Sequence, residues 1–332
     1  MPLPFISIAV GALGVGGYLD AKDKNEEAQK IIDKAKASYN SQKLLLETRQ
    51  TQAELACKIL GMQKKMTMET SVRRFRNAYD KIKDFRWETS VGLDEIGVFA
   101  ISQQEMMEFC ELSHVYQSLF SNVETGAAIS TAIFLALGGS PLGAVAGGSF
   151  GMLGTSGILG IGGTASSALA LTTAIPALSV VAAPTLFVTG ISASIKADEN
   201  LEKAQSEKAK AERAVEQMKN SEILCQGIVQ RAEMFNDLLV KLDGIFEKCT
   251  RELDETVRQK TVPFQQKIDM AKLTKKDLKL IAVTRSLAGA IKSVIDMPIL
   301  NQSEMLSEES KNQHDKIKKV IPEFERQANS VL

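Results

Sequence analysis

The stretch TGAAISTAIFLALGGSPLGAVAGGSFG, residues 125–151, opens a run of 71 residues without a formal charge that ends at residue 195. We call residues 125–195 the apolar block. It holds 13 of the chain's 23 glycines. A helix that spans a bilayer needs about 20 apolar residues, so the apolar block is long enough for two spans and a turn.

Four glycines in the apolar block, Gly139, Gly143, Gly147 and Gly151, lie four residues apart. This spacing places them on one helix face, where the missing side chains let a second backbone approach closely. Each glycine inside a soluble helix costs about 1 kcal/mol relative to alanine, so such a helix is more typical of a membrane. The pattern predicts a glycine zipper at a membrane or oligomer contact.

Beyond Gly151 the spacing falls to three, at Gly154, Gly157, Gly160 and Gly163. A period of three does not hold one face of an α-helix, so these glycines are the predicted turn of a hairpin. Its first arm is residues 126–151. Its second arm is residues 165–195, kinked at Pro176 and Pro184. Charged helices adjoin both arms at one end, so the hairpin is expected to enter and leave a membrane on the same side.

All 80 charged residues lie outside the apolar block and outside the N-terminal apolar segment, residues 1–19. The predicted regions are therefore residues 1–19, 20–124, 125–195 and 196–332. Acidic and basic residues are interleaved and the net charge is zero. Phosphate binding needs a local positive excess, so nucleic acid is not a predicted partner.

Two long amphipathic helices are predicted, one over residues 20–60 and one from residue 196 to beyond 246. Their apolar stripes resemble each other, as do the junctions where an apolar run feeds an Ala/Lys/Glu helix. This similarity fits two equivalent helices that each leave a membrane-proximal end, and convergent composition explains it equally well. The stripes are Ala28, Ile32, Tyr39, Leu46, Ala53, Ala56 and Leu60 in the first helix, and Leu201, Ala204, Ala211, Val215, Met218, Cys225, Val229, Ala232, Leu239 and Phe246 in the second.

A further amphipathic helix is expected over residues 272–299, and a polar one from residue 301 to Val320 that stops near Pro322. The predicted fold is all-α: an elongated antiparallel helical bundle or coiled coil with a central apolar, glycine-rich helical hairpin.

No group of residues with catalytic or metal-binding spacing stands out, so we predict neither an enzyme, a cofactor nor a metal. Two histidines, His114 and His314, leave no histidine-based set. The four widely spaced cysteines are expected to be buried, reduced thiols. Gly160-x-Gly162-x-x-Ala165 fits a dinucleotide fingerprint formally but lacks the preceding strand and the following acidic residue.

The layout resembles that of uncharacterised bacterial membrane-associated helical proteins labelled glycine-zipper or chemotaxis proteins. The residues that carry the resemblance are MPLPF with its glycine-rich start, the long helix after it, the apolar block and the junction VVAAPTLFVTGISASIKADENLEKAQ. The layout is also similar to apolipoprotein L and to α-helical pore-forming toxins of the ClyA/Hbl type. The resemblance implies membrane association and, by analogy, toxin or phage-defence roles.

The leading hypothesis is a membrane-active protein that inserts the glycine-zipper hairpin into a bilayer and oligomerises to permeabilise or remodel it. The alternative is a constitutive integral-membrane scaffold whose coiled-coil helices bind a helical partner protein. The expected partners are a lipid bilayer and further copies of the chain. The expected location is the bacterial cytoplasm and inner membrane, without a cleaved signal peptide.

Overall fold

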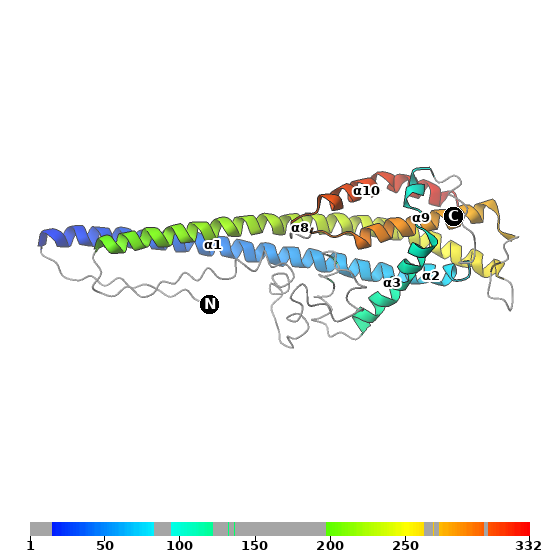
Figure 1. Ribbon diagram of the computed structural model, residues 1–332, viewed down its shortest axis with the longest axis horizontal. Coiled ribbons are helices and arrows are strands. Elements are labelled where there is room, and N and C mark those ends of the chain that lie inside the picture. Colours follow the sequence, from blue (N-terminus) through cyan, green and yellow to red (C-terminus); the bar gives the residue numbers. More distant parts are fainter. Residues whose placement is uncertain are drawn as a thin grey trace. The chain divides into compact units, whose positions relative to one another are not determined.

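The computed structural model describes residues 15–82, 94–121, 132, 136, 197–261, 268, 272–301 and 305–332 (Figure 1). It confirms the all-α class, since no strand occurs among these residues, only the isolated bridges Thr261–Ile268 and Leu300–Leu306. The elements are α1 (Val15–Thr67), a π-helical turn η1 (Met68–Val72), α2 (Arg73–Tyr79), a 3₁₀ turn η2 (Asp94–Phe99), α3 (Gln103–Ser121), α8 (Ala197–Lys260), α9 (Lys275–Asp296) and α10 (Glu308–Asn329).

The contacts divide the chain into two compact units. Unit 1 consists of Met1–Gln52 and Ile175–Gln226, and unit 2 of Ala53–Ala174 and Gly227–Leu332. The helices α1 and α8 each contribute one section to each unit. Both units therefore combine parts of the chain that are far apart in the sequence.

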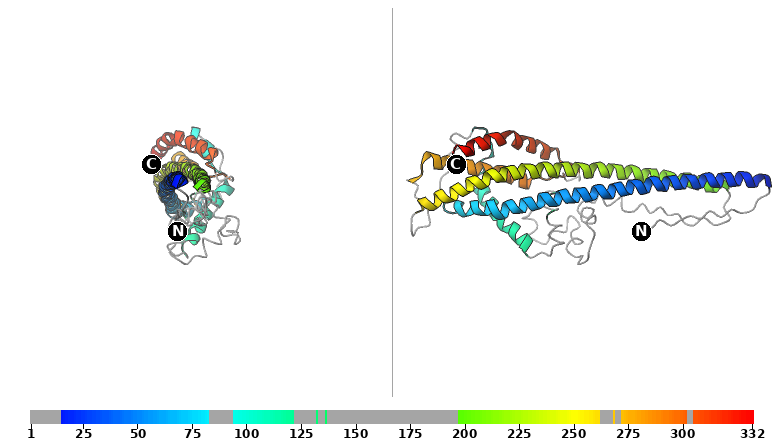
Figure 2. Two further views of the ribbon diagram at one scale, coloured as in Figure 1. Left: turned by 90° about the vertical axis from the view of Figure 1, so that its left-hand side faces the viewer. Right: turned by 180° about the vertical axis from the view of Figure 1, so that it is seen from behind.

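In unit 1, α1 and α8 lie side by side and run in the same direction (Figures 1 and 2). The side-chain amide of Asn200 donates a 2.9 Å hydrogen bond to Asn25, near the start of both helices. About 24 residues later, Arg49 Nε donates to Glu222 at 3.3 Å. The sequence separation is 175 residues at the first contact and 173 at the second, so the two helices are parallel.

The predicted antiparallel packing is therefore wrong for α1 and α8. Apolar stripes with a heptad-like spacing fit parallel and antiparallel pairing equally well. The polar side chains beside the stripes determine which of the two orientations forms. The stripes themselves are correct: all seven predicted positions of α1 are buried. In α8, Leu201, Val215 and Val229 are half-buried and the other seven predicted positions are buried.

In unit 2 the antiparallel expectation holds for α9. Buried Lys64 of α1 donates to the carbonyl oxygen of Ile295 at 2.9 Å, near the end of α9. Arg285, earlier in α9, acts electrostatically on Tyr79, which lies later in the chain than Lys64. The helix α9 begins with a capping box of Thr274 and Asp277, and twelve of its residues are buried. It is thus a bundle helix, as its amphipathic sequence predicts.

The helix α10 does not stop near Pro322, where the sequence suggested an end, but continues to Asn329. Proline removes one backbone hydrogen bond from a helix and costs about 3 kcal/mol. Burial offsets this cost, because Phe324 is fully buried and its ring centroid lies 5.9 Å from that of Phe99.

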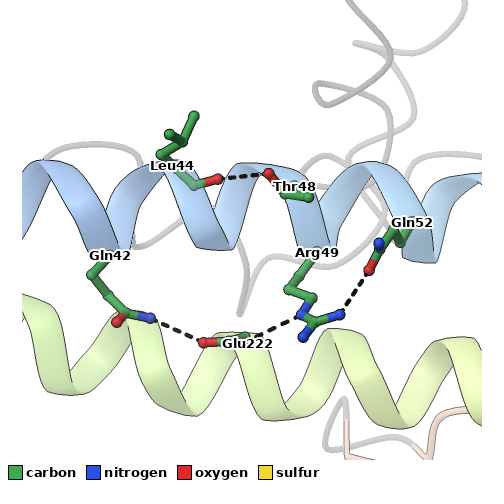
Figure 3. A network of polar contacts seen from close by, with 6 residues as sticks. All are labelled: Gln42, Leu44, Thr48, Arg49, Gln52 and Glu222. Atoms are coloured by element: carbon green, nitrogen blue, oxygen red, sulfur yellow. Dashed lines mark hydrogen bonds and ion pairs between the residues drawn. The ribbon is translucent and has the colours of Figure 1, made fainter.

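Figure 3 shows the polar network that helps to fix the parallel pair. Glu222 accepts hydrogen bonds from Gln42, at 3.0 Å, and from Arg49, whose guanidinium also donates to Gln52 at 3.0 Å. The side chain of Glu222 is 19% exposed, so its charge is largely withdrawn from water. A shifted register would leave that charge without these donors.

Replacing Glu222 with alanine is expected to lower the free energy of unfolding by about 1–2 kcal/mol, because Gln42 and Arg49 both lose their acceptor. Urea unfolding followed by circular dichroism measures the effect. The matched control is Glu47→Ala, since Glu47 pairs with Lys43 at 3.8 Å on the surface. An equal loss in both variants would contradict a role for the network in fixing the pair.

Candidate functional site: where the apolar segments meet the helices

The first candidate region is the start of the parallel pair in unit 1. Lys24 and Asp198 form a 2.9 Å ion pair there, beside the Asn25–Asn200 hydrogen bond. A small core of Ala28, Ile32 and Ala204 follows, with Ile31 and Leu201 packed against it. Two apolar sequences lead into these helices: the N-terminal apolar segment extends into the first residues of α1, and the apolar block ends just before α8. Parallel pairing therefore joins both apolar sequences to the same end of one helix pair.

The second candidate region is in unit 2, where the apolar block meets α1. A Cβ atom added at Gly61 would lie 2.1 Å from the carbonyl oxygen of Ala132. Only glycine permits such a close approach of two backbones. Ala132 and Ala136 are helical and fully buried. Two residues of the predicted first hairpin arm are thus packed within the bundle, a contact that we call the docking seam.

A buried carboxyl group lies on the same face of α1. Glu54 precedes Gly61 by seven residues, or two helical turns, and is only 4% exposed. One of its carboxylate oxygens has no hydrogen-bond partner in the part of the chain that the structure describes. Burial raises the pKa of Glu54 to about 7, and the charge of Lys58 opposes this rise. The face next to the docking seam therefore carries a group that titrates near neutral pH.

A buried cation lies about one helical turn beyond Gly61 on α1. Lys64 is 1% exposed, and burial lowers the pKa of its ammonium group to about 8 against the influence of Asp296. Its hydrogen bond to Ile295 satisfies a carbonyl in the last turn of α9, where a positive charge is favourable. This contact fixes α9 against the section of α1 that carries the docking seam.

Four apolar residues of α1 remain exposed on another face. Leu55, Ile59, Met62 and Met66 have exposed fractions of 56%, 49%, 38% and 55%. Their spacing of four, three and four residues is that of a coiled-coil contact. An apolar row of this kind is typical of an interaction surface rather than of a solvated one.

The eight zipper and turn glycines, Gly139, Gly143, Gly147, Gly151, Gly154, Gly157, Gly160 and Gly163, lie outside the described residues, as do the two predicted kinks at Pro176 and Pro184. Among the helices that the structure does describe, none combines the length and apolarity needed to cross a bilayer.

The cysteines match the sequence prediction: Cys57, Cys110, Cys225 and Cys249 are free and buried. Burial raises the pKa of Cys110 to about 12, that of Cys225 to about 11 and that of Cys249 to about 12. Thiols in this state are poor nucleophiles because they are protonated at neutral pH. The described ranges also contain no cluster of three metal-ligating side chains.

Sequence reasoning missed Gly61, Glu54 and Lys64. A signal existed for Gly61, since an isolated glycine inside a helical pattern often marks a close contact. No sequence signal marked Glu54 or Lys64, because they lie among many solvated charged residues of the same types. Comparisons with protein-family models, curated proteins and solved structures found no match for this chain.

Replacing Gly61 with alanine is expected to displace the segment around Ala132, because the added methyl group collides with a backbone carbonyl. The melting temperature should fall, and proteolysis within the apolar block should accelerate. Gly244→Ala is the control, since a Cβ there meets nothing within 4 Å. That variant should gain about 0.5–1 kcal/mol, as helix propensity predicts. Equal gains in both variants would contradict a close contact at Gly61.

Replacing Glu54 with glutamine is expected to remove part of the pH dependence of stability. The pKa of Glu54 is raised in the folded protein, so its neutral form is favoured there. Stability should therefore fall as the pH rises from the ordinary value of about 4.5 through 7, by up to about 3 kcal/mol from this group. The measurement is the free energy of unfolding of the variant and of the unmodified protein at pH 5 and at pH 8. The same change with pH in both proteins would refute the raised pKa of Glu54.

Proposed function

We propose that this protein acts on membranes by inserting the apolar block, as a glycine-zipper hairpin, into a lipid bilayer. In this proposal it oligomerises there and permeabilises or remodels the bilayer, without catalysing a reaction. A role as a toxin or as a phage-defence effector is consistent with such an activity.

The parallel pairing of α1 and α8 carries the proposal. It joins the N-terminal apolar segment and the second hairpin arm to the same end of one helix pair. Charged residues begin directly after them, at Asp20 and Lys196, as expected where a helix leaves the apolar part of a bilayer. Two apolar sequences at one end of unit 1 suit attachment to a single membrane.

The docking seam supports a proposal in which the apolar block inserts into the bilayer only after a trigger releases it from the bundle. Ala132 and Ala136 belong to the apolar block and are packed within the bundle of unit 2. A segment that is covered by its own helices can be released only if the energy of lipid contact exceeds that of packing. Burial of apolar surface contributes about 25 cal/mol per Å² in either setting, so in this proposal lipid contact replaces the apolar burial that packing supplies.

The exposed row of Leu55, Ile59, Met62 and Met66 supports the proposed self-association. Its heptad-like spacing fits a helix from another copy of the chain. Such a contact lies outside the bilayer in this proposal, and it adds to the contact between zipper faces inside it.

The alternative function is a constitutive integral-membrane scaffold whose coiled-coil helices bind a partner protein. The same exposed row on α1 favours it, because a partner helix fits there as well as a second copy does. Cell fractionation separates the two functions. Protein that is soluble until it meets a trigger supports the inserting effector, while protein that only detergent extracts supports the scaffold.

Dye release from liposomes tests the leading proposal. The double variant Gly143→Leu with Gly147→Leu fills the predicted zipper face and should lower leakage at least tenfold. The matched control, Ala144→Leu with Gly148→Leu, adds two leucines with the same spacing on a neighbouring face. Membrane binding and leakage that both persist in the zipper variant would overturn the proposal.

A further inference from the structure

The exposed apolar row of α1 occupies consecutive a and d positions of a heptad. Leu55, Ile59, Met62 and Met66 follow one another at four, three and four residues, which is the order d, a, d, a. They are between 38% and 56% exposed, and all four belong to unit 2. Leucine at d and isoleucine at a is the combination that favours two parallel strands. The row therefore has the composition of one half of a two-stranded coiled coil.

The structure of α1 limits this row to four layers. The next d position after Met66 is Glu69, which is half-buried, lies in the π-helical turn η1 and pairs with Lys65 at 3.9 Å. A π-helical turn does not keep the heptad phase, because its hydrogen bonds span five residues rather than four. In the other direction the preceding a position is Gln52, which is polar. An occupant of the row thus meets apolar side chains only from Leu55 to Met66.

One possible occupant is the same row of a second copy in the antiparallel direction. The spacing permits it, since Leu55 of one copy would meet Met66 of the other. Lys58 and Lys65 flank the row at its g positions. In an antiparallel pair g positions face g positions, so Lys58 of one copy would face Lys65 of the other. These like charges oppose the antiparallel arrangement.

The other arrangement of two copies is parallel. Each g position then faces an e position of the other copy, five residues further along the chain. Lys58 meets Gln63 and Lys65 meets Thr70, so no like charges face each other beside the four layers. The side chains at the a and d positions and the charges beside them favour the same arrangement.

We propose that the row of Leu55, Ile59, Met62 and Met66 binds the same row of a second copy as a parallel, two-stranded coiled coil of four layers. The inference rests on the proposed function and specifies how its copies associate outside the bilayer. Copies that enter one membrane from the same side are related by a rotation about the membrane normal, so equivalent helices in them point the same way along that normal. Parallel pairing meets this requirement.

The size of the row indicates where the pair forms. A specific interface buries about 800 Å² on each partner, and four half-exposed side chains provide less than this. The contact is therefore weak in dilute solution. It becomes stronger where copies are held together on a membrane, because the local concentration is high there.

Disulfide trapping in the full chain without lipid tests the contact and its direction. Leu55→Cys and Met66→Cys should each form a linked dimer at least tenfold faster than Val240→Cys, which places a thiol at a similarly exposed apolar position of α8. The native cysteines stay in place, because they are buried. In a mixture of the two row variants, mass spectrometry should find links between positions 55 and 66 no faster than in the control.

Two results of this experiment would overturn the proposal. A predominant link between positions 55 and 66 would show the antiparallel arrangement. Rates equal to that of Val240→Cys in every sample would show that the row does not bind a second copy.

Sedimentation equilibrium at high protein concentration, also without lipid, gives a second test. Ile59→Lys should raise the dissociation constant of the dimer at least tenfold, because it places two ammonium groups in one apolar layer. Val240→Lys is the matched control, since Val240 is 48% exposed and Ile59 is 49% exposed, and it should leave the constant unchanged. The same constant in all three proteins, or no association of the unmodified protein, would overturn the proposal.

Neither experiment contains a membrane, so the inference and the proposed function fail separately. A parallel cross-link without liposome leakage would refute only the proposed function. Leakage without the cross-link would refute only this inference.

Discussion

The parallel pairing of α1 and α8 is the constraint on which the rest of the structure depends. Antiparallel neighbours can be joined by a short turn, whereas parallel neighbours need a long connection that returns to the starting end. Residues 68–196 provide this connection, and the apolar block is its last part. The pairing thus decides that two apolar sequences lead into unit 1 at one end, which is the end where we propose that the protein meets a membrane.

The sequence predicted the buried helix faces, because the spacing of apolar residues defines them. The stripe from Ala28 to Leu60 is buried because an apolar spacing of three and four residues defines a helix face on its own. Direction is a different quantity. It depends on partners about 175 residues apart, such as Asn25 with Asn200, and no local pattern shows them. The prediction that the last helix stops near Pro322 was wrong for a similar reason. The packing of Phe324 on Phe99, a tertiary contact, offsets the cost of a proline inside the helix.

The docking seam was predictable only in part. Gly61 marks a close contact by being a glycine in a long helix, but its partner, Ala132, follows from tertiary packing alone. The charges of Glu54 and Lys64 are costly to bury, and their sequence neighbours are solvated charges of the same kind. Lys64 is satisfied by the end of α9, whereas one oxygen of Glu54 lacks a partner among the described residues. The buried ammonium group of Lys64 thus has a structural partner, whereas burial of the Glu54 carboxyl group favours its neutral form.

Electron-spin distance measurements within unit 1 test the central claim most directly. Labels at Asp33 and Ser206, both exposed, are predicted to lie side by side, while labels at Asp33 and Gln226 should be about 30 Å further apart along the helix axis. Parallel pairing predicts the short distance for the first pair and the long one for the second. The opposite order would show that α1 and α8 are antiparallel, and the two apolar sequences would then enter at opposite ends.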